Sequence, residues 1–287
     1  MIFYVQGEYV AQKDARVPVL DRGFLFGDSV YETVRSHGGR IIFWREHLAR
    51  LRRSAELLEI DIEEQRICPL EVLRELLRLN SLAQSRIRII VSRGEGGRDQ
   101  LDGFRATWVV TIEPFEVLPE EKYEEGVAAV QVSIQRHGVA SLNPEIKSSN
   151  LLNNVLARRE AVRAGAAEGI LLNPHGYLAE GAYSNLFWVT AQGELRTPAL
   201  AVGILPGVTR QKVLQVARSL PLAVREVEAL PVELDGAREI FLTSTSWEVL
   251  SVTRWNGQAV GHGRRGAIAR SLREGLRQLY EDPEETA

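Results

Sequence analysis

A charged segment near the middle of the chain sets its organisation: residues 114–125 read PFEVLPEEKYEE. The segment holds two prolines and shows little apolar periodicity, which is typical of a linker. Patterns of strands and helices occur on both sides of it, and a chain of 287 residues has room for two domains of roughly 100–200 residues each. We therefore predict an N-terminal domain over 1–117, a linker over 118–126 and a C-terminal domain over 127–287.

Both halves mix strands and helices without the strict alternation of a doubly wound sheet. VYETVRS and RIIFW, on either side of a His-Gly-Gly turn, predict a hairpin, and RIRIIVSR alternates like a half-buried strand. Apolar stripes predict helices over about 46–58, 69–80, 149–164 and 265–280, and the terminal EDPEETA is expected to fray. The predicted fold class is mixed α/β (α+β) in two domains.

Composition excludes several classes of protein. Lys plus Arg number 35 and Asp plus Glu number 38, so the net charge of −3 favours neither nucleic acid nor an anionic membrane as a partner. The single cysteine, Cys68, cannot form an internal disulfide and is interpreted as a structural thiol. The histidines have no metal-site spacing, and no apolar run approaches the ~20 residues of a membrane span. With no signal-peptide pattern in MIFYVQGEYV, we expect a cytoplasmic protein without a metal.

Lys147 stands out because it is isolated in the segment NPEIKSSNLLNN, between Ile146 and two serines. A lysine near apolar groups loses hydration of its charged form, and the neutral amine is a nucleophile that forms Schiff bases. A surface lysine with its ammonium in water is the alternative interpretation.

Other motifs match what a Schiff-base cofactor with a phosphate would need. GVTR (207–210) places backbone N–H groups and the Thr209 hydroxyl at a helix start, and STS (244–246) adds hydroxyls at a strand end. Glu180 closes a strand and could protonate a ring nitrogen. Arg98 and Tyr31 are candidates to bind a substrate carboxylate, although the Arg98 segment SRGEGGRDQ is also typical of a solvated loop.

Taken together, these motifs resemble the class IV aminotransferases, the fold-type IV enzymes that use pyridoxal 5′-phosphate. The resemblance extends from about Tyr4 to Val260 through collinear motifs: DRGFLFGDSVYETVR, REHLARL, IKSSNLL, EGILL, LAEGAYSNLFWV, TPALAVGILPGVTR and EIFLTSTSWEV. It implies two α/β domains with the cofactor between them, in a homodimer that acts on amino acids and 2-oxo acids.

The resemblance also implies roles for particular residues. Lys147 would form the covalent link to the cofactor and carry the proton, and Glu180 would pair with the pyridine nitrogen. Arg50, in REHLARL, would bind the cofactor phosphate with Val208, Thr209, Ser244 and Thr245. Tyr31 and Arg98 would bind substrate.

Within the family, the substrate interpretation rests on a few positions. Asn150 follows the lysine by three residues, as in D-amino-acid aminotransferases and aminodeoxychorismate lyases, and Tyr31 is present, as in the D-amino-acid enzymes. Gln100, where those enzymes have histidine, departs from their pattern, and SRGEGGR with Thr33 resembles aminodeoxychorismate lyase. Leu151 stands where bacterial branched-chain enzymes have tyrosine. We predict an aminotransferase of amino acid metabolism with D-amino acids favoured; aminodeoxychorismate lyase and a branched-chain or primary-amine aminotransferase are the alternatives.

Overall fold

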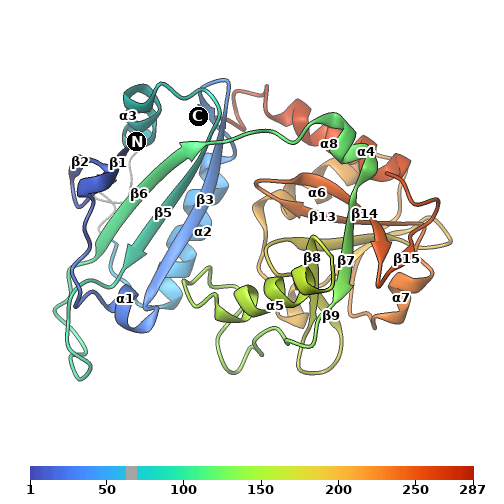
Figure 1. Cartoon of the computed structure of the whole chain (residues 1–287), viewed down its shortest axis with the longest axis horizontal. Helices are drawn as coiled ribbons and strands as arrows, with labels where there is room; N and C mark the ends of the chain where they lie inside the picture. Colours follow the sequence, from blue (N-terminus) through green and yellow to red (C-terminus); the bar gives the residue numbers. More distant parts are fainter. Residues whose placement is uncertain (63–69) are drawn as a thin grey trace. The chain divides into compact units, whose positions relative to one another are not determined.

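The computed structural model describes residues 1–62 and 70–287, which divide into two compact units. The first unit comprises Met1–Glu116, Ile146–Asn150 and Tyr280–Ala287, and the second comprises Val117–Glu145 and Leu151–Leu279. Both units combine strands and helices, so the mixed α/β class is confirmed (Figure 1). Cys68 lies outside the described residues. In the described ranges no helix is both long and apolar enough to cross a membrane.

The first unit is built on a six-stranded sheet in the order β2-β1-β6-β5-β3-β4. Every neighbouring pair in it is antiparallel. Its strands are β1 (Ile2–Val5), β2 (Glu8–Ala11), β3 (Ser29–His37), β4 (Arg40–Ile41), β5 (Ser85–Ser92) and β6 (Thr107–Pro114), and its helices are α1 (Arg22–Phe26), α2 (Trp44–Leu57) and α3 (Leu70–Asn80), with a 3-10 turn at Gln12–Asp14.

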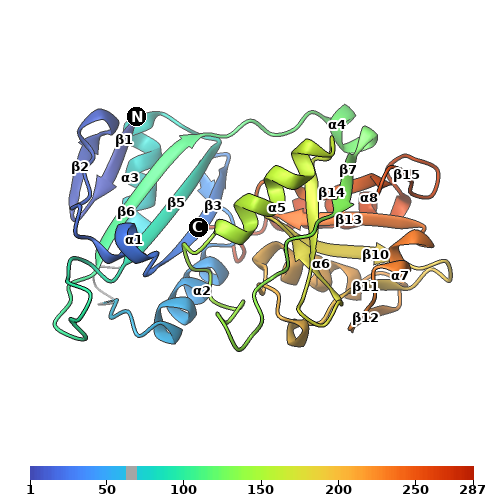
Figure 2. The same cartoon turned by 60° about the horizontal axis from the view of Figure 1, so that its bottom comes forward.

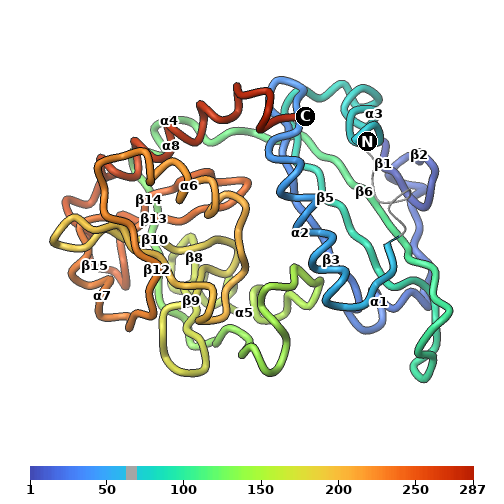
Figure 3. Tube along the Cα trace, turned by 180° about the vertical axis from the view of Figure 1, so that it is seen from behind, coloured from blue at the N-terminus to red at the C-terminus, as the bar shows by residue number. Residues whose placement is uncertain are grey.

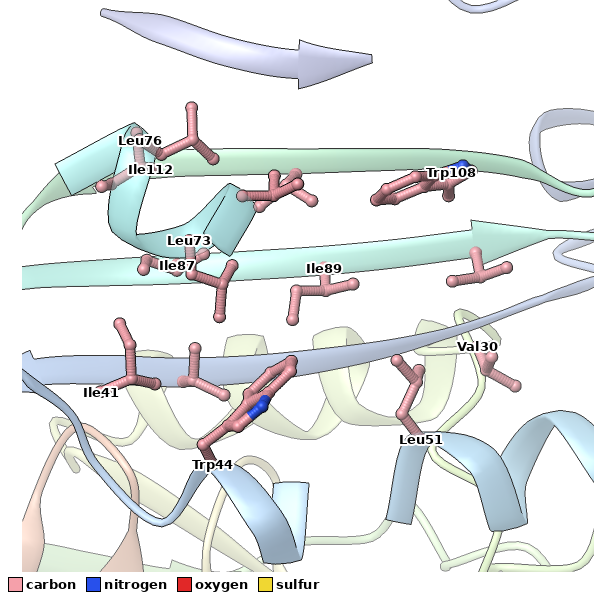
Figure 4. Close-up of a cluster of buried hydrophobic side chains, with 14 of the residues drawn as sticks. Val30, Ile41, Trp44, Leu51, Leu73, Leu76, Ile87, Ile89, Trp108 and Ile112 are labelled. Carbon is pink, nitrogen blue, oxygen red and sulfur yellow. The ribbon is translucent and has the colours of Figure 1, made fainter. Parts of the chain in front are cut away.

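Alternation along the strands decides which face of this sheet is covered. Ile87 and Ile89 on β5 are fully buried, and they pack with Val30 of β3, Leu51 of α2 and Leu73 of α3 in one core (Figure 4). The residues between them therefore point to the opposite face, because successive strand side chains alternate. The helix predicted over about 46–58 corresponds to α2, and its apolar stripe packs into this core.

The second unit is built on a nine-stranded mixed sheet in the order β12-β11-β10-β13-β14-β7-β8-β9, with β15 paired to β14. The pairs β11–β12, β14–β7 and β7–β8 are parallel. The strands are β7 (Val127–Gln131), β8 (Glu168–Leu172), β9 (Leu178–Gly181), β10 (Asn185–Val189), β11 (Leu195–Pro198), β12 (Val224–Val227), β13 (Glu239–Ser244), β14 (Glu248–Trp255) and β15 (Gln258–Ala259).

Five helices and a 3-10 turn accompany this sheet: α4 (Glu120–Glu125), α5 (Leu152–Arg163), α6 (Val208–Arg218), α7 (Val232–Asp235), α8 (Ala267–Leu279) and Leu200–Val202 (Figure 2). The helices α6 and α8 contact each other and the strand β13. Phe187 on β10 and Phe241 on β13 stack with ring centroids 5.2 Å apart, and Trp188 is fully buried in the core formed by the neighbouring positions. This packing makes β10, β13 and β14 the rigid centre of the unit.

Three segments differ from the sequence-based expectations. RIIFW was expected as a strand, but β4 ends at Ile41 and α2 begins at Trp44, because Phe43 has φ of 52° and turns the chain. The tail does not fray: Ala287 and Ile41 exchange backbone hydrogen bonds of 2.7 and 2.9 Å, beside the blue β3–α2 segment in Figure 3. The stretch predicted as a linker contains the helix α4.

Candidate active site

Lys147 lies in a short extended segment that pairs with the edge of β3 away from β5. Tyr31 donates its backbone N–H to the carbonyl of Lys147 at 2.9 Å, and Ser149 donates to the carbonyl of Ser29 at 2.9 Å. The N–H of Lys147 is bound by the Ser54 hydroxyl of α2 at 3.1 Å. Ile146 is buried in the core of the first unit. The backbone of Lys147 is thus held by both β3 and α2, and helix α5 starts only at Leu152.

The side chain of Lys147 lies against the ring of Tyr31. Its Nζ is 4.6 Å from the ring centroid, and the guanidinium of Arg88 is 4.0 Å from the same centroid. The structure therefore brings Tyr31, Lys147 and Arg88 together. The strand pattern RIRIIVSR carried the signal for Arg88, because it alternates with Ile87 and Ile89, which face the core.

Arg50 is held by a buried acidic residue that sequence reasoning missed. Its Nε and Nη2 donate to the two carboxylate oxygens of Glu32 at 2.6 and 2.9 Å, a bidentate arrangement. Glu32 Oε2 also lies 2.8 Å from Nδ1 of His47. Burial by itself raises the pKa of Glu32, but Arg50 and His47 outweigh it and hold that pKa well below its usual range. Burial lowers the pKa of His47, and the charges of Arg50 and Lys147 lower it further, so the net shift is downward although Glu32 raises it. The cluster therefore holds an ionised carboxylate and a neutral imidazole at neutral pH.

In the second unit, Glu180 ends β9 with its carboxylate fully engaged by N–H donors. Arg136 Nε donates to Oε1 at 2.7 Å, while Asn185 Nδ2 and the backbone N–H of Leu205 donate to Oε2 at 3.0 and 3.1 Å. Arg136 is itself buried. Three donors of this kind stabilise the charged form of a carboxylate and fix its orientation. Nothing in the sequence pointed to Arg136, which is 44 residues away from Glu180 along the chain.

A second buried carboxylate holds the loop that follows Glu180. Glu168, at the start of β8, accepts hydrogen bonds from the Ser184 hydroxyl at 2.9 Å and from the backbone N–H of Tyr183 at 3.2 Å. Burial raises the pKa of Glu168 above its ordinary value, and these hydrogen bonds offset only part of the effect. The loop is therefore fixed at both ends, by Glu168 and by the donors to Glu180.

Asn185 connects Glu180 to the start of α6. Its amide Oδ1 lies so close to Gly207 that a Cβ on that glycine would be 1.9 Å from it, so only glycine fits there. Gly207 is the N-cap of α6 and offers no side chain to its first N–H groups. Val208 and Thr209, the first two residues of the helix, are both buried. An N-terminus without a side-chain cap presents free backbone donors and is a suitable place for a phosphate.

Ser244 ends β13, and Thr245 follows it in the turn to β14. Asn185 pairs with Thr243 in the β10–β13 ladder, so the end of β13 is next to Asn185 and hence to Gly207. Ser244 Oγ accepts a hydrogen bond from the backbone N–H of Trp247 at 3.1 Å. The structure thus places Glu180, the N-terminus of α6 at Gly207 and the end of β13 next to Asn185. This donor set fits a phosphorylated ring with a basic nitrogen.

Arg98 is exposed in the segment between β5 and β6 and is not brought into the cluster of Tyr31, Arg88 and Lys147 within the first unit. The side chain of Arg93, in the same segment, is occupied by hydrogen bonds within the first unit. It donates to Asp28 at 2.8 Å, to the carbonyl of Leu58 at 2.6 Å and to the carbonyl of Glu59 at 2.8 Å. Of Arg93 and Arg98, Arg98 is the exposed one.

Comparison with known proteins finds similarity to aminotransferases, both in sequence and in structure. The family model described as amino-transferase class IV matches residues 29–255. A putative branched-chain-amino-acid aminotransferase of Methanocaldococcus jannaschii is 36% identical over 281 residues, 97% of this chain and 96% of the relative. A D-alanine aminotransferase of Bacillus licheniformis is 34% identical over 271 residues, 94% of each protein. The solved branched-chain amino acid aminotransferase of T.th. with pyridoxamine 5′-phosphate matches with a TM-score of 0.91 and 29% identity, over 100% of this chain and 97% of that one.

Proposed function

This chain belongs to the class IV aminotransferases, and we propose that it moves the amino group of a small D-amino acid to a 2-oxo acid. Its cofactor is pyridoxal 5′-phosphate, the cofactor of the family. The observation that carries the proposal is Lys147, an isolated lysine whose backbone is fixed by β3 and α2 and whose amine lies on the Tyr31 ring.

Each group of residues described above has a role toward the cofactor in this proposal. When bound, the cofactor ring withdraws electrons from the substrate carbon and so makes its proton easier to remove. Lys147 would hold the cofactor covalently and would transfer that proton. Glu180, oriented by Arg136 and Asn185, would keep the ring nitrogen protonated. The phosphate would be bound by the start of α6 at Val208 and Thr209, by Ser244 and Thr245, and by Arg50.

Glu32 gives Arg50 a fixed direction. A free arginine side chain loses rotamer entropy when it binds a phosphate, whereas one already held in a bidentate pair loses less. The paired guanidinium still carries hydrogen-bond donors in a planar arrangement that suits phosphate. We therefore assign the buried Glu32–His47 pair to the support of Arg50.

Two arginines are candidates to bind the substrate carboxylate. Arg98 is exposed on its loop, and Arg88 is half-buried on the Tyr31 ring that also contacts Lys147. Bidentate binding of a carboxylate by either guanidinium would orient the substrate Cα–H toward the amine. We propose Arg98 as the anchor and Arg88 as a second contact for substrates that carry another carboxylate.

The choice of amino donor rests on sequence positions and on the relatives. Asn150 and Tyr31 resemble the D-amino-acid enzymes, and a D-alanine aminotransferase is 34% identical. A branched-chain L-amino acid is the second candidate, favoured by the 36% identical putative branched-chain enzyme. The relatives described above are aminotransferases, so transamination is proposed rather than the elimination of pyruvate by a lyase.

We also propose a homodimer. The segment around α1 exposes several large apolar side chains: Val19 at 75%, Leu20 at 59% and Phe24 at 75% relative exposure. Apolar surface of this kind commonly marks a protein–protein interface. One chain has a mass of 32.1 kDa, and light scattering on the purified protein should measure twice that mass. A monomer at micromolar concentration would contradict this part of the proposal.

The decisive experiment combines substrate turnover with covalent labelling. The cofactor-loaded protein is incubated with 2-oxoglutarate and either D-alanine or L-leucine, and glutamate formation is followed. Faster turnover of D-alanine supports the first candidate, and faster turnover of L-leucine the second. Borohydride reduction followed by peptide mapping should find the cofactor on Lys147, and a label on another lysine would refute the assignment.

A further inference from the structure

Glu248 is a glutamate in a backbone conformation that normally requires glycine. Its φ is 57°, in the left-handed region, although the residue is fully buried. It follows the three-residue connection 245–247 of the β13–β14 hairpin and pairs with Ser244 across the ladder. Glycine adopts the left-handed conformation without steric cost, whereas other residues adopt it rarely. A glutamate there indicates that its side chain is needed.

The side chain of Glu248 is tied to helix α8. Its Oε2 accepts a hydrogen bond from Nε of Arg273 at 2.9 Å and lies 3.5 Å from Nε of Arg277. Arg273 is also buried, donates through Nη1 to Glu120 of α4 at 2.7 Å, and has its guanidinium carbon 3.3 Å from the centroid of the Tyr123 ring. One guanidinium therefore joins the hairpin, α8 and α4.

The same hairpin turn presets the direction of a hydroxyl. Because Ser244 Oγ already accepts the N–H of Trp247, its own hydrogen is available to be donated away from the turn. That donor is useful only if residues 244–247 keep one conformation. The carboxylate of Glu248, immediately after the turn, is the group that fixes the chain at this point.

We propose that Glu248 and Arg273 are positioning residues that lock the 244–247 turn in the conformation in which Ser244 and Thr245 bind the cofactor phosphate. The proposal rests on the phosphate-binding role assigned to that turn above. Neither Glu248 nor Arg273 contacts the reacting atoms; they act through the turn. The left-handed backbone at Glu248 is maintained because the ion pair with Arg273 outweighs its steric cost.

The test compares Glu248→Gly, which relaxes the backbone and removes the carboxylate, with Arg273→Lys, which keeps a positive charge but cannot reach Glu248 and Glu120 as one planar group. Arg270→Gln is the matched control, because Arg270 lies on the same helix and pairs with Glu124 at the surface. Hydrogen exchange of the amides of 244–248 is measured on the cofactor-free protein. The dissociation constant of pyridoxal phosphate is measured by absorbance titration of the same variants.

We expect both variants to exchange the 244–248 amides faster and to bind pyridoxal phosphate about 10- to 100-fold more weakly, which corresponds to the loss of one well-aligned hydrogen bond to a charged group. Arg270→Gln should match the parent in both measurements. If Glu248→Gly does not fold, as judged by exchange of the buried strand β8, Arg273→Lys alone decides the result.

Two results would overturn the proposal. Unchanged exchange at 244–248 would show that the ion pair does not hold the turn. Faster exchange with an unchanged dissociation constant would show that the turn does not serve the phosphate. Failure of the parent protein to bind pyridoxal phosphate is a different outcome, since it refutes the proposed function and takes the role of the turn with it.

Discussion

Replacement of Glu32 by glutamine tests the buried cluster beside Lys147. The carboxylate of Glu32 is fully buried and accepts two hydrogen bonds from Arg50. Its Oε2 also lies within hydrogen-bond distance of Nδ1 of His47. Removing one partner of a buried ion pair leaves the other charge uncompensated, at a cost of about 3–5 kcal/mol. Glu32→Gln should lower the free energy of unfolding at neutral pH by that amount.

The pH dependence gives the prediction a second, independent signature. The folded-state pKa of Glu32 lies below its ordinary value of 4.5, so its stabilising effect is fully present above that pH and is lost as the pH falls. Below about pH 4.5 the difference between parent and variant should shrink by about 1.4 kcal/mol per pH unit, because the unfolded parent alone takes up the proton.

Urea unfolding of both proteins at several pH values measures these differences. Glu56→Gln is the matched control, because Glu56 lies on α2 and pairs with Arg53 in an exposed ion pair. Exposed pairs contribute little, so this variant should unfold like the parent at every pH. A Glu32→Gln variant as stable as the parent at neutral pH, or a difference that does not change with pH, would refute the reasoning.

Three further predictions concern the site. Glu180→Gln should still bind the cofactor but slow amino-group transfer in single-turnover experiments by about two to four decades, since a preorganised charge is lost; an unchanged rate would contradict its role. Arg98→Ala should reduce kcat/KM for amino acids by about one to three decades and spare simple primary amines, which have no carboxylate; equal losses would exclude Arg98 as the anchor. Glu168→Gln should raise the melting temperature relative to the parent increasingly as the pH rises above 4.5, because the raised folded-state pKa makes ionisation of Glu168 destabilising; a constant difference in calorimetry would contradict this.

Local patterns in the sequence predicted much of the fold. The apolar stripe of α2 and the alternation of β5 appear as buried faces in the structure, because each pattern spans enough residues to specify its period. RIIFW was misread because a short apolar run is ambiguous between strand and helix, and the left-handed Phe43 that decides it has no sequence signature. The tail was misread because its partner, Ile41, is far away in the sequence.

Some residues of the candidate site could be predicted from the sequence, and others could not. Lys147 could be identified because it is the only charged residue in its local segment after Glu145. In the structure its backbone is hydrogen-bonded to Tyr31 and Ser54. Glu32 and Arg136 could not be found, because each is significant only through a partner brought close by the fold, Arg50 and Glu180 respectively. The position of Arg88 could have been predicted from the alternation of strand side chains, since an arginine between two core isoleucines must face the opposite side of the sheet.

The pairing of distant segments with β3 and its neighbours has a consequence for synthesis on the ribosome. The edge of β3 at Ser29–Tyr31 acquires its partner only when residues 147–149 have been made. Ile41, which pairs with Ser36 on one side, acquires its second partner only with Ala287. At about 5–20 residues per second, those partners emerge many seconds after the strands they complete. Nascent chains therefore expose an unpaired strand edge for that interval, which is a surface prone to association with other chains. The first unit is therefore completed only after all residues of the second unit have been made, because Tyr280–Ala287 belong to it.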